Sequence, residues 1–175
     1  IGYPVVLKAV SATLTHKSDA GAVLLGINSE GELRAGWDTI LANVQAYNAG
    51  NNVSHNVDGM IVAKQVSGGL EMVLGLHRDP EVGLVLMAGM GGVWLELIKD
   101  VAFAMPPVSP EKARDMLSRT RVATLLRGYR GGPEYDFDAL IDAITALGKF
   151  ASDCGEHLES VDLNPVAVLP KGQGA

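Results

Sequence analysis

The chain has 175 residues, of which 47% are hydrophobic and 19% are charged, so it is long enough and apolar enough to fold as one domain or two small lobes without disulfide or metal cross-links. Its formal net charge of −6 argues against a nucleic-acid partner, and its single cysteine, Cys154, excludes an internal disulfide. No apolar run is long enough to span a membrane and no signal peptide precedes the first predicted strand, so we expect a soluble cytoplasmic domain without a membrane partner.

The first predicted strand is the apolar run from Val5 to Leu7, and Lys8 follows it directly. A lysine at the end of a buried strand costs free energy unless it has a partner. The polar loop His16 to Asp19 follows, and a second apolar strand runs from Ala22 to Ile27. A lysine that faces a loop of donors can bind a polyanion such as a nucleotide phosphate. The alternative is a surface lysine beside an ordinary hairpin loop.

The middle of the chain predicts one helix and then several short strands. Apolar residues at helical spacing predict an amphipathic helix from about Glu32 to Asn48, and a polar loop follows from Gly50 to Asp58. Short apolar runs separated by glycine turns and an Asp-Pro turn then predict an antiparallel meander. Its predicted strands are Met60 to Val66, Glu71 to Leu76, Gly83 to Met87, Val93 to Ile98 and Val101 to Met105.

The stretch Gly89-Met90-Gly91-Gly92 contains three glycines between two of these predicted strands. A dinucleotide-binding fold needs a helix after such a stretch, and here a strand is predicted instead. A glycine loop between strands can still cover phosphates through its backbone N–H groups.

The last third of the chain has two clear helix starts and a final strand. Ser109 before Pro110 predicts a helix that extends to about Arg119, and Asp136 predicts the start of another. The final strand, Val161 to Leu169, is interrupted by Asn164-Pro165.

Asp162 and Asn164 lie two positions apart on this strand, so we expect their side chains on one face. Two oxygen-bearing side chains suit Mg²⁺, which shares its ligands between protein and nucleotide phosphates. An Asx turn formed by Asn164 before Pro165 is the alternative.

Five stretches of the sequence together carry a family resemblance. They are GYPVVLKAVSATLTHKSDAG, VSGGLEMVLGLHRDPEVG, GMGGVWLELIKDVAF, LLRGYRGGP and VDLNPVAVLP. In this order they resemble the ATP-grasp domain of the nucleoside-diphosphate-forming acyl-CoA synthetases. That family includes the ADP-forming acetate–CoA ligases and is related to the β subunit of succinyl-CoA synthetase. The resemblance implies that residues 1–175 form an α+β ATP-grasp fold, with two lobes of antiparallel sheet and flanking helices that hold a nucleotide between them.

The resemblance also implies roles for individual residues. Lys8 would contact the nucleotide phosphates and His16 would relay a phosphoryl group, so both are candidate catalytic residues. Asp162 and Asn164 would hold Mg²⁺. The other implied nucleotide-binding residues lie in the loop after the first strand, in the adenine-lining segment and around the glycine stretch: Lys17, Ser18, Ala63, Lys64, Gln65, Glu71, Gly91, Gly92 and Glu96. An acidic residue is frequent in the family's adenine-lining segment and is absent here, which leaves nucleotide selectivity open.

The implied function is the nucleotide-binding part of an acid–CoA ligase that uses ATP and Mg²⁺. It would transfer phosphate between ATP and a histidine while an acyl-CoA forms from a carboxylic acid and CoA. CoA-binding and phosphohistidine domains, in the same polypeptide or in a partner subunit, would complete the reaction. We therefore expect a fragment of a larger synthetase that is not active alone. The alternatives are a nucleotide-sensing regulatory domain fused to an acyltransferase and a succinyl-CoA-synthetase-like subunit.

Overall fold

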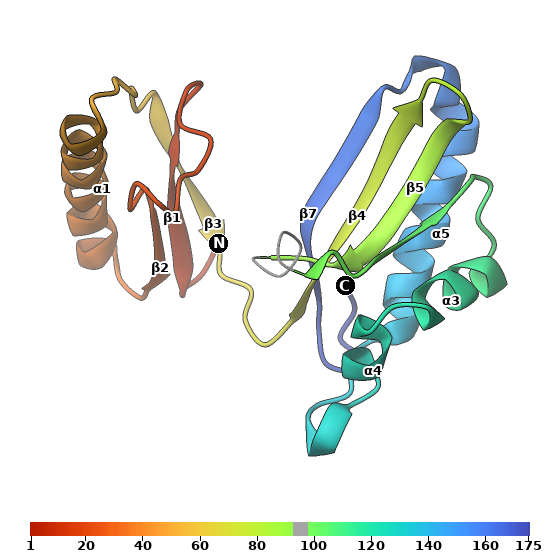
Figure 1. Ribbon diagram of the computed structural model, residues 1–175. Helices are drawn as coiled ribbons and strands as arrows, with labels where there is room; N and C mark the ends of the chain where they lie inside the picture. Colours follow the sequence, from red (N-terminus) through yellow and green to blue (C-terminus); the bar gives the residue numbers. More distant parts are fainter. Residues whose placement is uncertain (93–97) are drawn as a thin grey trace. The chain divides into compact units, whose positions relative to one another are not determined.

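The computed structural model describes residues 1–92 and 98–175, and the chain divides into two compact units, Ile1–Ser67 and Gly68–Ala175 (Figure 1). Each unit has its own antiparallel sheet and its own hydrophobic core. No helix in these two ranges combines the length and apolar character that a membrane crossing requires. The α+β class and the two sheets with flanking helices are confirmed.

The first unit is a three-stranded sheet in the order β2-β1-β3, with one long helix against one of its faces (Figure 1). Its elements are β1 (Val5–Val10), β2 (Val23–Ile27), α1 (Glu30–Asn51) and β3 (Gly59–Lys64). Ser29 starts α1 by accepting a hydrogen bond from the backbone N–H of Glu32 at 3.2 Å. The Glu32 carboxylate in turn accepts from the Asn28 backbone N–H at 2.8 Å. The predicted helix is confirmed and is slightly longer at both ends.

The second unit is a four-stranded sheet in the order β6-β5-β4-β7, with its helices packed against one face (Figure 1). Its strands are β4 (Leu70–Asp79), β5 (Gly83–Met90), β6 (Val101–Ala104) and β7 (Ser160–Val168). Its helices are α3 (Pro110–Ser118), α4 (Val122–Leu126), α5 (Phe137–Cys154) and two short 3-10 turns, η1 (Tyr129–Gly131) and η2 (Gly155–His157). Leu74 and Leu86 of the sheet and Leu140 and Ile144 of α5 are fully buried in its core.

The predicted meander is confirmed only in part. Strands β4, β5 and β6 do pair in sequence order, each antiparallel to the next. Strand β3 does not belong to this sheet, because it pairs with β1 of the first unit along its whole length. The second edge of β4 is occupied instead by β7, which returns from the far end of the chain. The glycine turn at Ser67-Gly68-Gly69 is therefore the junction of the two units and not a hairpin turn. The predicted strand at 93–98 lies outside the described residues, apart from Ile98.

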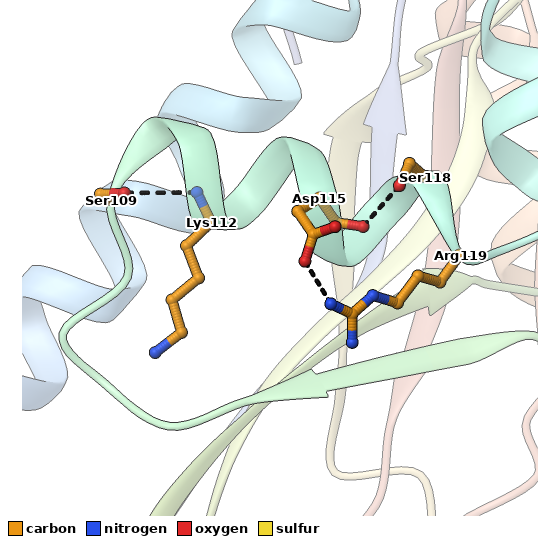
Figure 2. Close-up of polar contacts among 5 residues, drawn as sticks. All are labelled: Ser109, Lys112, Asp115, Ser118 and Arg119. Carbon is orange, nitrogen blue, oxygen red and sulfur yellow. Dashed lines mark hydrogen bonds and ion pairs between the residues drawn. The ribbon is translucent and has the colours of Figure 1, made fainter.

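The two ends of helix α3 are stabilised by interactions between residues close together in the sequence (Figure 2). The Ser109 hydroxyl accepts a hydrogen bond from the Lys112 backbone N–H at 3.2 Å, and Pro110 occupies the first turn, where no backbone donor is needed. Near the other end, Asp115 forms an ion pair with Arg119, four residues along, and its carbonyl accepts from the Ser118 hydroxyl at 2.7 Å. Because each interaction joins residues three or four positions apart, both ends of the helix can be predicted from the local sequence.

Asp136 starts α5 and also holds the end of the chain in place. One carboxylate oxygen accepts from the Ala139 backbone N–H at 3.2 Å and the other from the Gly174 backbone N–H at 2.8 Å. These hydrogen bonds, the one from Gly174 most strongly, lower the pKa of the Asp136 carboxyl below its ordinary value. The interaction favours the charged carboxylate, so it also stabilises the folded unit.

We expect this contribution to be pH-dependent. It is fully present above about pH 4, the ordinary range of an aspartate pKa, and is lost as the pH falls through the lower pKa of the folded state. The free energy of unfolding of wild-type protein should therefore decrease with falling pH more steeply than that of an Asp136→Asn variant. Urea unfolding at a series of pH values between about 5 and 2.5 measures both slopes. Asp142→Asn, an exposed change on the same helix, is the matched control, and a slope for Asp136→Asn equal to wild type would contradict the expectation.

Candidate functional site

Lys8 lies on the face of the first sheet that α1 does not cover. Successive side chains of a strand alternate between the two faces, and Leu7 and Ala9, on either side of Lys8, are buried in the core beneath α1. Lys8 itself is exposed. The sequence prediction of a lysine on the first strand is confirmed, and the strand continues beyond it to Val10.

The neighbours of Lys8 on this face are apolar. In the register of the sheet Lys8 stands opposite Val23 on one side and Ile61 on the other, and the side chain of Ile61 is 54% exposed. Ala63 pairs with Val6, two positions from Lys8, and therefore lies on the same face. We call these five residues, Val6, Lys8, Val23, Ile61 and Ala63, the Lys8 face. It combines one ammonium group, which attracts phosphate, with the exposed side chain of Ile61 and the partly exposed Val23 and Ala63, on which a planar base can pack, whereas Val6 is buried.

The loop after β1 carries the predicted residues His16, Lys17 and Ser18. It is closed by two backbone hydrogen bonds, from Ala22 N–H to the Lys17 carbonyl at 2.8 Å and from Gly21 N–H to the Ser18 carbonyl at 3.0 Å. The side chains of His16 and Ser18 are exposed, and that of Lys17 is half-buried. The loop is thus ordered by its backbone and leaves polar side chains at its surface, which is compatible with phosphate contacts. The roles of these three residues stay predictions.

The end of β3 carries Lys64 and Gln65. Lys64 stands opposite Val5 and is exposed. The Gln65 side-chain carbonyl accepts a hydrogen bond from the Gly26 backbone N–H at 2.6 Å, so this amide joins the end of β3 to β2. The Gln65 side chain is therefore used within the first unit, and the nucleotide contacts predicted for Ala63, Lys64 and Gln65 stay predictions.

The structure brings Glu71, Gly91 and Gly92 together. The Gly91 N–H donates to the Glu71 carbonyl at 2.9 Å. A Cβ on Gly91 would lie 2.7 Å from the carbonyl carbon of Met72, and one on Gly92, whose φ is +62°, would lie 2.4 Å from Glu71 Oε2. The backbone of β4 leaves no room for a side chain at Gly91, and the positive φ favours glycine at Gly92, where the Glu71 carboxylate lies beside the chain. Glu96, predicted to bind nucleotide beside them, lies outside the described residues.

Two backbone N–H groups of the glycine stretch already donate hydrogen bonds within the protein. Its backbone N–H groups were expected to cover phosphates, but the Met90 N–H already donates to the Asp100 carbonyl at 3.0 Å and the Gly91 N–H to Glu71. Neither amide is free for a ligand in this arrangement. Gly91 and Gly92 also let the backbone pass close to Glu71, and their contacts with a nucleotide stay predictions.

The predicted metal ligands lie on β7, next to β4. Asp162 stands opposite Gly75, and both Asp162 and Asn164 are exposed. The register shifts between Leu163 and Val166, which leaves Asn164 and Pro165 in a bulge opposite a single residue of β4. Regular alternation therefore ends just before Asn164, because a strand bulge breaks the two-residue period. The shared orientation of the two side chains stays a prediction.

Asp162 and Asn164 on β7 can bind Mg²⁺ only if other groups supply further ligands. Within residues 1–92 and 98–175, no three side chains of histidine, cysteine, aspartate or glutamate gather in a group that could hold a metal ion. Asp162 and Asn164 offer exposed oxygen atoms of the kind that Mg²⁺ prefers, and Mg²⁺ commonly takes its other ligands from phosphates and water. These two residues therefore fit a metal that arrives with a nucleotide.

A cavity of about 440 Å³ lies beside Asp162 on the second sheet. Gly75 forms its floor, because a residue without a side chain leaves space between Asp162 and Met87, its neighbours on either side. Phe103, 61% exposed, continues the row on β6, and His77 lines the cavity from the next row of β4. Sequence reasoning missed this cavity. The cavity follows from the pairing of β7 with β4, which the sequence alone does not reveal.

Comparisons with known proteins give a consistent result. The family model described as "ATP-grasp domain" matches residues 1–175. The chain is 35% identical over 175 residues to the β subunit of acetate–CoA ligase (ADP-forming) II of Pyrococcus furiosus, covering all of this chain and 72% of that subunit. It is 41% identical over 172 residues to acetate–CoA ligase (ADP-forming) I of Archaeoglobus fulgidus, covering 98% of this chain but only 24% of that protein.

The structural comparison agrees. The dinucleotide-forming acetyl-coenzyme A synthetase 1 of Candidatus Korarchaeum cryptofilum, in complex with coenzyme A, Ca-AMPCP and HgCl⁺, superposes with a TM-score of 0.86 at 38% identity, covering 98% of this chain and 73% of that chain. Another structure of the same protein contains coenzyme A and Mg-AMPPCP, with its phosphohistidine segment pointing towards the nucleotide binding site. The chain thus spans most of a separate β subunit and about a quarter of a single-chain ligase.

Proposed function

Because the chain belongs to the ATP-grasp domain family, we propose that it is the nucleotide-binding part of an ADP-forming acyl-CoA synthetase. It binds ATP with Mg²⁺ and transfers phosphate between ATP and a histidine while an acyl-CoA forms from a carboxylic acid and CoA. The observation that carries the proposal is the Lys8 face, where a single ammonium group stands between apolar side chains on an uncovered sheet. The similarity to proteins whose structures contain AMPCP or AMPPCP supports it.

The proposed chemistry depends on charge neutralisation and positioning. Phosphoryl transfer spreads negative charge over the oxygens of the transferred group, so fixed positive charge beside them lowers the barrier. Lys8 supplies an ammonium group of the first unit to the phosphates. Asp162 and Asn164 of the second unit hold Mg²⁺, which supplies further positive charge when it is bound.

The nucleotide itself is proposed to contact three further groups of residues. The base packs on the apolar part of the Lys8 face near Ala63, with polar contacts from Lys64 and the backbone at Gln65. Lys17 and Ser18 extend the phosphate contacts from the loop after β1, and Glu71 binds polar groups of the nucleotide beside Gly91 and Gly92. Glu96 completes this set.

His16 is proposed to relay the phosphoryl group between ATP and a phosphohistidine segment in the same polypeptide or in a partner subunit. Its imidazole is exposed on the loop after β1, so an incoming segment can reach it. The CoA-binding and acid-binding parts lie in the rest of the enzyme, and the chain alone does not complete the reaction. Because the reaction uses ATP and CoA, which are intracellular metabolites, we place the enzyme in the cytoplasm.

Calorimetric titration of the chain with ATP tests the proposal, with and without Mg²⁺. We expect binding that strengthens when Mg²⁺ is present, because the metal joins the phosphates to carboxylate and amide oxygens. CTP at the same concentrations is the control ligand, since it carries the same triphosphate on a different base. Absence of binding for every nucleotide would contradict the proposal. Binding without transfer of label from [γ-³²P]ATP to any histidine of the full-length enzyme would favour the regulatory alternative.

A further inference from the structure

Asp100, which directly precedes β6, reaches the start of α4 with its side chain. Its Oδ1 accepts a hydrogen bond from the Arg121 backbone N–H at 2.8 Å, and its Oδ2 accepts one from the Val122 backbone N–H at 2.7 Å. The Arg121 side chain makes no capping hydrogen bond of its own. The first amides of a helix have no partner within the helix. A carboxylate that is distant in sequence thus takes the place of a local cap, and hydrogen bonds to a charged acceptor are strong.

The backbone of the same residue contacts residues 89–92, which are the last two residues of β5 and the two glycines after it, and which we call the glycine loop. The Asp100 carbonyl accepts from the Met90 N–H at 3.0 Å, and a Cβ on Gly89 would lie 2.3 Å from that carbonyl oxygen. On its other side the loop is bound to β4, where the Gly91 N–H donates to the Glu71 carbonyl at 2.9 Å. Gly89 and Met90 also pair with β4 and β6 as part of β5, so the hydrogen bonds to Asp100 and Glu71 extend the sheet pairing to the end of this segment.

The residue before Asp100 is held in an unfavourable conformation. Lys99 has a φ of +51°, in the left-handed region that residues with a side chain rarely adopt. Its carbonyl accepts from the Val101 N–H at 3.0 Å, so the chain reverses sharply at Asp100. Such a conformation persists only where its surroundings hold it. The two hydrogen bonds from α4 to the Asp100 carboxylate provide that restraint.

We propose that Asp100 is a positioning residue: its carboxylate, anchored to α4, fixes the glycine loop against Glu71 and thereby sets the affinity for nucleotide. The effect on affinity rests on the function proposed above. The effect on the loop does not, because it follows from hydrogen bonds within the second unit alone.

Hydrogen exchange in Asp100→Asn tests the effect on the loop. The asparagine keeps the size of the side chain but replaces one acceptor oxygen with an NH₂ group, which cannot accept from α4. We expect amide exchange at Met90 and Gly91, followed by NMR, to become about tenfold faster relative to Leu74 in the middle of β4. Unchanged exchange at both amides would overturn the inference.

Asp136→Asn is a matched control for this experiment. The two oxygens of Asp136 also accept from two backbone N–H groups, those of Ala139 and Gly174, but at the start of α5. The same substitution there should lower the melting temperature without changing exchange at Met90 and Gly91. If both variants accelerate exchange at these amides equally, the effect is general destabilisation and the inference fails.

Calorimetric titration with Mg-AMPPCP tests the effect on affinity. We expect Asp100→Asn to bind several-fold more weakly than wild type at a temperature where both are folded, and Asp136→Asn to bind like wild type. Faster loop exchange with unchanged affinity would overturn the role in nucleotide binding. If wild-type protein does not bind Mg-AMPPCP at all, the proposed function fails, whereas the exchange rates at Met90 and Gly91 still decide whether Asp100 fixes the loop.

Discussion

Replacing Lys8 with methionine should slow phosphoryl transfer from ATP in the complete enzyme by about 10²–10³-fold, or about 3–4 kcal/mol of transition-state stabilisation. The change removes the one ammonium group of the Lys8 face, while methionine keeps the length of the side chain and suits the apolar neighbours Val23 and Ile61. The fold should therefore be preserved. The rate of ADP formation at saturating ATP measures the effect, and circular dichroism verifies the fold.

Lys149→Met is the matched control for this prediction. Lys149 lies on α5, where its ammonium group pairs with the Asp153 carboxylate at 2.6 Å and has no place in the proposed site. The same chemical change there should leave the rate unaltered, because an exposed pair of this kind contributes little. A loss for Lys8→Met of less than tenfold, about 1.4 kcal/mol, would remove Lys8 from the phosphate-binding role.

Asn164→Ala should produce a loss of similar size, about 3–4 kcal/mol, and should raise the concentration of Mg²⁺ that the enzyme requires. The substitution removes one of the two oxygen ligands proposed on β7 and leaves Asp162 in place. Alanine adds no charge and no bulk at the exposed bulge opposite β4. The rate of ADP formation as a function of Mg²⁺ concentration, at fixed ATP, measures both effects.

The alternative for Asn164 makes a different prediction. If its side chain only stabilises the turn before Pro165, the alanine variant should unfold at lower urea concentration and keep the wild-type Mg²⁺ requirement. Asn51→Ala serves as control, because the Asn51 side chain donates to the Tyr47 carbonyl in the last turn of α1, within the first unit. An unaltered Mg²⁺ requirement together with a loss below tenfold would exclude Asn164 as a metal ligand.

The features predicted correctly from sequence are those whose cause is local. Ser109 and Asp136 accept hydrogen bonds from backbone groups three residues along the chain, so the signal and the structure lie in the same few residues. The first strand was likewise predicted from its local run of apolar residues, with Lys8 at its end, although its exposure on one face of the sheet was left open between two interpretations. These cases needed no information about distant parts of the chain.

The features that sequence reasoning missed depend on partners far away in the chain. The hairpin expected between β3 and β4 is wrong because β3 pairs with β1 and β4 pairs with β7, and apolar strands of similar length do not encode which neighbour they select. The cavity floor at Gly75 became visible only with the register of β7. The capping role of Asp100 was missed for the same reason, since the helix it caps begins 22 residues later.

The two hydrophobic cores have a thermodynamic consequence. The core of the first unit and that of the second have no residue in common, so each unit has its own set of apolar contacts to lose on heating. A chain built in this way does not have to unfold as a single cooperative step, and one melting temperature then does not describe it. The van't Hoff enthalpy of such a transition is smaller than the calorimetric enthalpy. A destabilising substitution in one core therefore has to be assigned to its own unit before its free energy is interpreted.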